Sequence, residues 1–253
     1  MSKRFILKVL RGTSAFQYFE KYPLEYDNKD SVVSILLKLQ KNPINIKNEK
    51  TTPVTWESGC LEGSCGSCMM LINSKPQLAC MTFIRDCLKE TSNNEITLSP
   101  LKKFSLIRDL VVDRSLLFEN LKKVSAWIEI ENRHCIYGPK ITPRLHSLLY
   151  PLLTCISCGA CFEACPQISK NSKALGPTTI SLIRFFNLHP YGKKDKRKRT
   201  LPLLEEGGIS LCVNAQNCLR VCPMDISLVE SISDMQREST KQFLKEMNPF
   251  KKK

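Results

Sequence analysis

The sequence predicts an α+β protein of two domains, in which the first is built on a small β-sheet and the second is all-α. Two observations predict this class. Strand-like patterns are confined to the first half of the 253 residues, and helical periodicity dominates the second half. A chain of this length allows one large domain or two modest ones, and the distribution of cysteine motifs favours two. We place the domains at residues 1–103 and 104–253.

The first domain begins with a strand-like stretch at residues 5–10. Residues 31–39 then predict an amphipathic helix, because apolar residues recur there at helical spacing: Val32, Ile35, Leu36 and Leu39. A cysteine-rich loop and a further strand near residues 69–72 follow. This order is typical of a β-grasp sheet that holds a metal cluster in an edge loop.

The second domain is predicted to begin helical, because apolar and charged residues alternate at a helical period over residues 107–113 and 116–121. Further helices are expected at residues 142–153, 178–187 and 226–236, the first of them buried. The longest uncharged stretch in this half, near residues 145–153, is far shorter than the ~20 apolar residues of a membrane span. We therefore expect no helix that crosses a bilayer.

Thirteen cysteines are the most informative residues of the chain, and seven of them stand in two related runs. The first run has the spacing C-x2-C-x2-C-x3-C-P, and the second has C-x5-C-x3-C-P with Ala215 where a complete frame would carry another cysteine. The first pattern is typical of bacterial ferredoxins, in which three cysteines hold one cubane cluster and the fourth reaches the other.

Crossed ligation assigns these cysteines to two clusters. The [4Fe–4S] ligands are predicted to be Cys155, Cys158, Cys161 and Cys222. The other cluster then has only Cys165, Cys212 and Cys218, because the methyl group of Ala215 cannot bind iron. Three thiolates favour [3Fe–4S], and a four-iron cluster capped by water or hydroxide remains the alternative.

A third metal site is predicted in the first domain. Its spacing, C-x4-C-x2-C with a distant fourth cysteine, is the plant-type [2Fe–2S] pattern. The predicted ligands are Cys60, Cys65, Cys68 and Cys80. Gly59, Gly63 and Gly66 are expected to leave room for backbone N–H groups to approach the cluster.

Other uses of the cysteines fit less well. A disulfide framework is disfavoured, because the chain opens without a secretory signal. Zinc is the stronger rival, but three cysteines two apart with a fourth before proline are more thiolates than a tetrahedral site needs. Cys87 and Cys135 fall outside every motif and are predicted to pack as buried free thiols. His134, His146 and His189 are interpreted as surface or packed side chains rather than ligands.

The net charge of +14 includes a basic run at residues 193–199. We interpret this run as a solvated surface loop, with contact to anionic headgroups or an acidic partner as the alternative. Binding to nucleic acid is disfavoured, because no aromatic residues interleave the run.

Several stretches carry a resemblance to a known family. They are residues 53–60, 63–68, 100–114, 176–177 and 186–190, together with the three-cluster spacing. Through these stretches, over about residues 5–240, the chain resembles the iron–sulfur subunit of the succinate dehydrogenase and fumarate reductase family.

The resemblance implies an electron-transfer subunit of respiration and the tricarboxylic acid cycle. The [2Fe–2S] cluster would face a flavoprotein subunit with covalent FAD, and the [3Fe–4S] cluster would lie beside a membrane-anchor cytochrome b subunit, with quinone as acceptor. Fumarate reductase, running in reverse, is the alternative, and a zinc-binding nucleic-acid module is a remote one. The expected location is peripheral, on the cytoplasmic face of a bacterial inner membrane or the matrix face if the chain is organelle-encoded.

The chain departs from many family members at the quinone site. The tryptophan pair expected after Cys165 and the histidine expected after Cys212 are absent, so no quinone-binding residue is assigned. In this respect the sequence resembles the branch of the family that pairs with a di-haem anchor and uses menaquinone. In the stretch between the domains, an ion-paired hinge that fixes the interdomain angle is predicted for Arg108, Asp109, Asp113 and Arg114.

Overall fold

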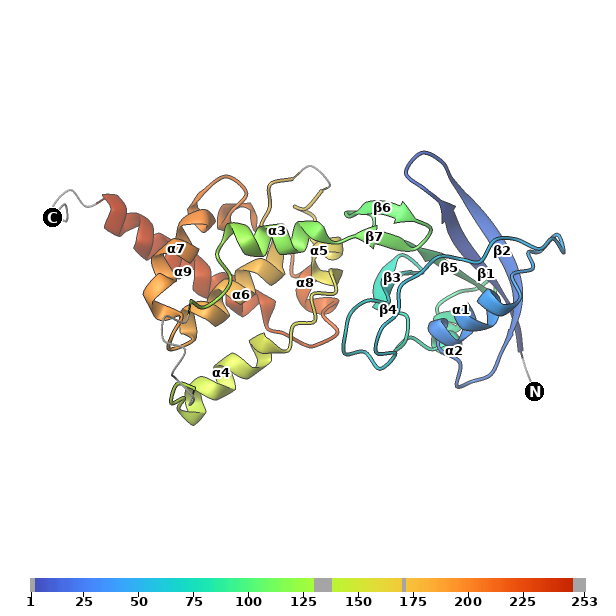
Figure 1. The fold of residues 1–253 in the computed structure, drawn as a ribbon, viewed down its shortest axis with the longest axis horizontal. Helices are drawn as coiled ribbons and strands as arrows, with labels where there is room; N and C mark the ends of the chain where they lie inside the picture. Colours follow the sequence, from blue (N-terminus) through green and yellow to red (C-terminus); the bar gives the residue numbers. More distant parts are fainter. Residues whose placement is uncertain (1–2, 130–137, 170–171, 248–253) are drawn as a thin grey trace. The chain divides into compact units, whose positions relative to one another are not determined.

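The computed structural model describes residues 3–129, 138–169 and 172–247 (Figure 1). Within these ranges the chain forms two compact units. The first consists of the residues up to Arg114 together with the returning segment Ile156–Glu163, and the second of Ser115–Cys155 and the residues from Ala164 onward.

The first unit contains a five-stranded mixed sheet in the order β2-β1-β5-β3-β4. β1 pairs antiparallel with β2 and parallel with β5, and β3 pairs antiparallel with β4 and β5. The strands are β1 (Lys3–Gly12), β2 (Gln17–Tyr26), β3 (Met69–Ile72), β4 (Lys75–Leu78) and β5 (Glu95–Ser99), and the helices are α1 (Val32–Lys41) and α2 (Ile84–Lys89). The predicted strands at residues 5–10 and 69–72 are confirmed.

Side-chain periodicity explains the first elements of this unit. In β1, Phe5, Leu7 and Val9 are buried at every second position, as expected for a strand with one face on the core. The predicted helix at residues 31–39 is confirmed as α1. Its first turn is capped by Ser31, whose Oγ accepts a hydrogen bond from Ser34 N–H at 3.2 Å.

Residues 105–113 form a β-hairpin, so the prediction of a helix there is wrong. The hairpin consists of β6 (Ser105–Arg108) and β7 (Val111–Asp113), paired antiparallel. Asp109 turns the chain with a φ of 49°, a left-handed conformation that aspartate tolerates better than most residues. The residue pattern of so short a stretch is compatible with both a helix and a strand. Contacts of the turn with residues far away in the sequence determine that it forms a hairpin.

Cys87 is buried in α2, as predicted, whereas Cys135 lies outside the described residues. Burial is the main reason that the pKa of the Cys87 thiol is raised to about 11.

We predict that Cys87 resists alkylation in the folded protein. At pH 8 its thiolate fraction should be about one in a thousand, and the thiolate is the reactive form. Iodoacetamide labelling followed by peptide mapping would test this, with urea-unfolded protein as the control. Labelling of Cys87 at equal rates in the folded and unfolded protein would contradict the prediction.

The described part of the second unit contains helices and no strand. Its helices are α3 (Ser115–Lys123), α4 (Pro143–Leu153), α6 (Gly176–Leu188), α7 (Lys196–Thr200), α8 (Asn217–Arg220) and α9 (Leu228–Met247), and α5 (Ala160–Ala164) starts in the returning segment of the first unit. The short 3-10 helices are η1 (Lys193–Asp195), η2 (Leu201–Leu204) and η3 (Ile209–Leu211). The helices predicted at residues 142–153, 178–187 and 226–236 are confirmed.

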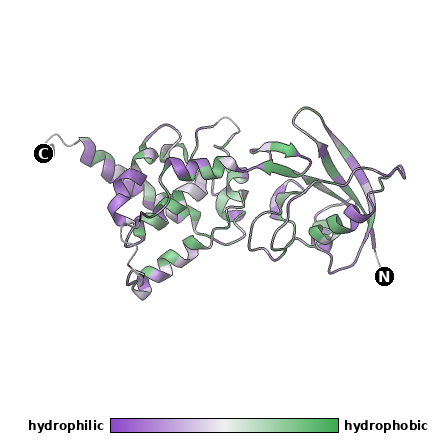
Figure 2. Ribbon diagram, in the orientation of Figure 1, coloured by the Kyte–Doolittle hydropathy of each residue, from purple (hydrophilic) through white to green (hydrophobic). Residues whose placement is uncertain are grey.

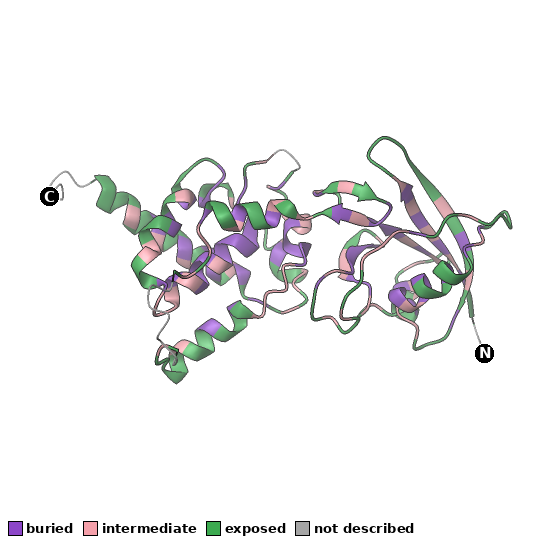
Figure 3. Ribbon diagram, in the orientation of Figure 1, coloured by how far each residue is buried: buried purple, intermediate pink, exposed green. Residues whose placement is uncertain are grey.

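The core of the second unit forms around α6, which is apolar in Figure 2 and buried in Figure 3. Ile180 and Ile183 of α6 pack with Ile232 and Met235 of α9. In contrast, α4 is mostly exposed: Leu149 and Leu152 are buried, but Tyr150 and Leu153 are about 60% exposed. The prediction that this helix is buried therefore holds only for one face.

The basic run at residues 193–199 is not a solvated loop but folds as η1 and α7, which packs against α9. Arg199 is fully buried and donates two hydrogen bonds to the carbonyl oxygen of Gly192, at 2.9 and 2.7 Å. The neighbouring basic residues form ion pairs with acidic residues: Lys196 with Glu238, Arg197 with Glu246 and Lys198 with Glu129. Much of the local charge is thus balanced within the unit.

Candidate functional site

The four cysteines predicted to bind [2Fe–2S] lie in the first unit, three of them in the loop before β3 and Cys80 shortly after β4. Backbone N–H groups of this loop point at the sulfur atoms. Cys60 N–H donates to Cys65 Sγ at 3.4 Å, and the N–H groups of Glu62 and Ser64 donate to Cys60 Sγ at 3.4 and 3.2 Å. Cys68 Sγ lies 3.3 Å from Cys80 Sγ.

The surroundings of the loop shift the pKa values of Cys65 and Cys80 in opposite directions. The pKa of Cys65 is lowered to about 6, first by its hydrogen bond with the Ser67 hydroxyl and then by the Cys60 N–H. The pKa of Cys80 is raised to about 11, first by burial and then by its neighbour Cys68. Cys60 also raises the pKa of Cys80, so the two cysteine pairs interact electrostatically.

The backbone of the loop leaves room for a bound group. A Cβ atom on Gly59 would lie 2.9 Å from Cys65 Sγ, and Gly66 has a φ of 76° that L side chains rarely adopt. Beside the loop, the Nε atom of Arg114 is buried and has no hydrogen-bond acceptor among the described residues. A thiol loop with inward N–H donors and an orphaned cationic donor fits an anionic iron–sulfur cluster.

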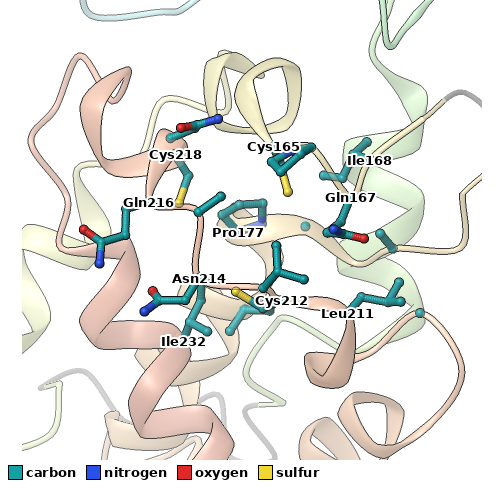
Figure 4. A pocket seen from close by; sticks show the side chains of 18 of the residues that line it. Cys165, Gln167, Ile168, Pro177, Leu211, Cys212, Asn214, Gln216, Cys218 and Ile232 are labelled. Atoms are coloured by element: carbon teal, nitrogen blue, oxygen red, sulfur yellow. The ribbon is translucent and has the colours of Figure 1, made fainter.

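The three cysteines predicted to bind [3Fe–4S] line one cavity of the second unit. Figure 4 shows Cys165, Cys212 and Cys218 around it with their sulfur atoms pointing inward, and Ala215 belongs to the same lining. The pKa of Cys218 is raised, mainly by burial and then by Cys165 and Cys212, so the three thiols are close enough to interact.

The loop around this cavity is shaped by local backbone geometry. Asn214 and Gln216 have left-handed φ values of 55° and 58° on either side of Ala215. Asn217 Nδ2 donates to the carbonyl oxygen of Ala164 at 3.2 Å and so ties the loop to the segment that carries Cys165. The rest of the lining is largely apolar, with Pro177, Ile180 and Ile232. A site with three thiols and apolar walls, in which Ala215 takes the place of a fourth cysteine, fits a cluster with three protein ligands.

The four cysteines predicted to bind [4Fe–4S] are divided between the units. Cys158 and Cys161 are buried in the returning segment of the first unit, and Cys155 and Cys222 belong to the second. The returning segment is held by Lys103 N–H, which donates to Glu163 Oε2 at 3.0 Å. The ligation of this cluster stays a prediction.

The charged residues at 108–114 belong to the first unit, and two of them form ion pairs within it. Asp109 forms a buried ion pair with Arg11 at 3.2 Å, and the half-buried Arg114 forms an ion pair with the more exposed Glu57 at 3.4 Å. Ion pairing of these two is confirmed, and their effect on the interdomain angle stays a prediction. Arg11 and Glu57 were not predicted, because no local pattern signals partners that lie so far away in the sequence.

The histidines in the described ranges are not arranged as ligands. His146 is exposed and stacks on Tyr150, and His189 is half-buried, with a pKa lowered by burial. His134 lies outside the described residues. Within the described residues, no group of three or more His, Cys, Asp or Glu side chains is arranged to hold a single metal ion.

Two family models match the chain. A 2Fe-2S iron-sulfur cluster binding domain matches residues 6–119, and a 4Fe-4S dicluster domain matches residues 151–226. Over 240 residues the chain is 41% identical to the succinate dehydrogenase iron-sulfur subunit of Bacillus subtilis, which covers 94% of this chain and 93% of that protein. The chain belongs to the succinate dehydrogenase and fumarate reductase iron–sulfur subunit family.

Other relatives agree with this family. The fumarate reductase iron-sulfur subunit of Haemophilus influenzae is 31% identical over 241 residues, covering 90% of this chain and 88% of that protein. The fold matches a chain of the Mycobacterium smegmatis Sdh1 complex in the apo form, with a TM-score of 0.81, 23% identity, and coverage of 98% and 99%. These matches confirm the α+β fold, the electron-transfer role and the predicted iron–sulfur cofactors.

Proposed function

We propose that this chain is the iron–sulfur subunit of a succinate dehydrogenase. The observation that carries the proposal is the presence of a [2Fe–2S]-type loop and a three-thiol cavity with Ala215 on one chain that is 41% identical to such a subunit over 94% of its length. Fumarate reduction is the second candidate, supported by the relative from Haemophilus influenzae. When bound, the clusters accept and donate single electrons.

We assign the ligands as the cysteine spacing predicts. The protein's part is to hold the clusters in place and to tune them through burial and hydrogen bonds to sulfur. The proposed sets are Cys60, Cys65, Cys68 and Cys80 for [2Fe–2S]; Cys155, Cys158, Cys161 and Cys222 for [4Fe–4S]; and Cys165, Cys212 and Cys218 for [3Fe–4S].

The proposed partners are an FAD-containing flavoprotein subunit, a membrane-anchor cytochrome b with two haems, and menaquinone. The structure describes no helix of this chain that is long and apolar enough to cross a membrane. We propose that the anchor subunit supplies the membrane attachment and that this chain has a peripheral position on the cytoplasmic face.

Oxygen-free purification of the complex would test the proposal. We expect acid-labile sulfide in near-stoichiometric amount with iron and three distinct paramagnetic centres. Steady-state rates with succinate and fumarate, against ubiquinone and menaquinone analogues, would then decide the direction and the quinone. Zinc in place of iron and sulfide would refute the proposal, and a faster fumarate reaction would favour the second candidate.

A further inference from the structure

The side chain of Arg114 bridges the two flanks of the cysteine loop in the first unit. Its Nη1 lies 3.4 Å from Glu57 Oε2, three residues before Cys60. Its Nη2 donates to the carbonyl oxygens of Ser67 at 3.0 Å and Met69 at 3.4 Å, on either side of Cys68. One guanidinium group therefore contacts the chain before the first cysteine of the loop and around the last.

Burial makes this contact electrostatically strong. The Arg114 side chain is only 16% exposed, and Glu57, the anion beside it, is 42% exposed and so better screened by solvent. A delocalised cation with a fork of donors suits this position, because it can bond two carbonyl oxygens and a carboxylate at once. Its Nε donor is buried and has no acceptor among the described residues.

We propose that Arg114 is a positioning residue of the [2Fe–2S] site. Its hydrogen bonds and ion pair clamp the two flanks of the loop together, and its positive charge raises the reduction potential of the cluster. The inference rests on the proposed assignment of the [2Fe–2S] ligands. Reduction adds a negative charge to the cluster, and a partly desolvated cation beside the loop stabilises the reduced form more than the oxidised form.

The charge part of the inference predicts opposite shifts for the two members of the ion pair. Arg114→Met removes the cation and should make reduction of the [2Fe–2S] cluster about tenfold less favourable, a fall of about 59 mV for a one-electron couple. Glu57→Gln removes the neutralising anion and should raise the potential by a smaller amount. A merely structural role of either residue would not produce shifts of opposite sign.

The clamp part of the inference is tested with Arg114→Lys. Lysine keeps the charge but cannot reproduce the fork, so the potential should stay close to the native value while the cluster is lost faster on warming or chelation. Arg108→Met is the matched control, because it removes an exposed arginine from the hairpin that directly precedes Arg114. This control should leave both the potential and the retention of the cluster unchanged.

The measurement is an EPR-monitored redox titration of the purified complex, with the other two clusters as internal references. Unchanged [2Fe–2S] potentials in both Arg114→Met and Glu57→Gln would overturn the inference while leaving the proposed function intact. If Arg114→Met fails to retain the [2Fe–2S] cluster while the others remain, the clamp is supported and Glu57→Gln tests the charge. The absence of a [2Fe–2S] signal from the native protein would instead overturn the proposed function.

Discussion

Replacement of Asp109 by alanine is expected to destabilise the first unit by about 4 kcal/mol, the cost of removing one partner from a buried ion pair. Asp109 is 2% exposed and pairs with the equally buried Arg11. Its carboxylate also accepts hydrogen bonds from Gly12 N–H at 2.8 Å and Thr55 N–H at 2.9 Å. Alanine would leave these donors unsatisfied, and the left-handed φ of 49° disfavours it further.

The effect should reach the cluster loop through Arg11. This arginine bonds Glu20 at 2.8 Å and the carbonyl oxygens of Thr52 and Pro53 at 3.0 and 3.2 Å, just before the loop. Burial alone would lower the pKa of Arg11, but Tyr22, Asp109 and Glu20 outweigh it and raise the pKa. Without Asp109, Arg11 therefore stays charged in a buried position, and its ion pair with Glu20 balances that charge only in part.

Thermal unfolding followed by tryptophan fluorescence would measure this effect. The two tryptophans are Trp56 and Trp127, so a Trp127→Phe background makes Trp56 report on the first unit. The midpoint should fall by more than about 10 °C, together with loss of the visible absorption of the cluster. The unfolding midpoint of Asp109→Asn should fall less, because asparagine keeps one hydrogen-bond acceptor and tolerates the positive φ.

An exposed aspartate provides the control for the Asp109 variants. Asp86 also forms ion pairs, with Lys89 and Arg85, but at the surface, where such pairs contribute little. Asp86→Ala should leave the midpoint unchanged. If Asp109→Ala behaves like Asp86→Ala, the buried pair does not hold the first unit together.

The second large effect is expected from Ala215→Cys. Ala215 lines the cavity shared by Cys165, Cys212 and Cys218, so a thiol there would give the second cysteine run the same four-cysteine spacing as the first. The cluster should then take up one more iron and become [4Fe–4S]. Its oxidised form would lose its paramagnetism, because three ferric ions have an odd electron count and the oxidised four-iron cluster has an even one.

Iron analysis and EPR of the air-oxidised complex would show this change. We expect one additional iron per chain and loss of the oxidised-state signal. Ala215→Ser is the matched control, since it adds a group of similar shape without a thiol, and it should keep the signal. An unchanged signal and iron content in Ala215→Cys would mean that a side chain at position 215 does not reach the place where a fourth iron would bind.

How much could be predicted from the sequence differs between elements. Strand β1 and helix α1 were predictable, because their apolar residues repeat at the period of the element that forms. The hairpin at residues 105–113 was not, since its turn depends on Gly12, whose N–H meets Asp109 across 97 residues. The basic run at residues 193–199 was misinterpreted for the same reason, because its acidic partners lie mainly in α9.

The sequence by itself determined the number and spacing of the thiols and the alanine at position 215, because both are properties of the covalent chain. The tertiary structure alone decided what surrounds those thiols. The guanidinium of Arg114 and the carboxylate of Asp109 reach the first unit's cluster loop and the segment before it only after folding. Electrostatic tuning depends on the distances between charged groups and on their burial, and neither can be read from the residue order alone.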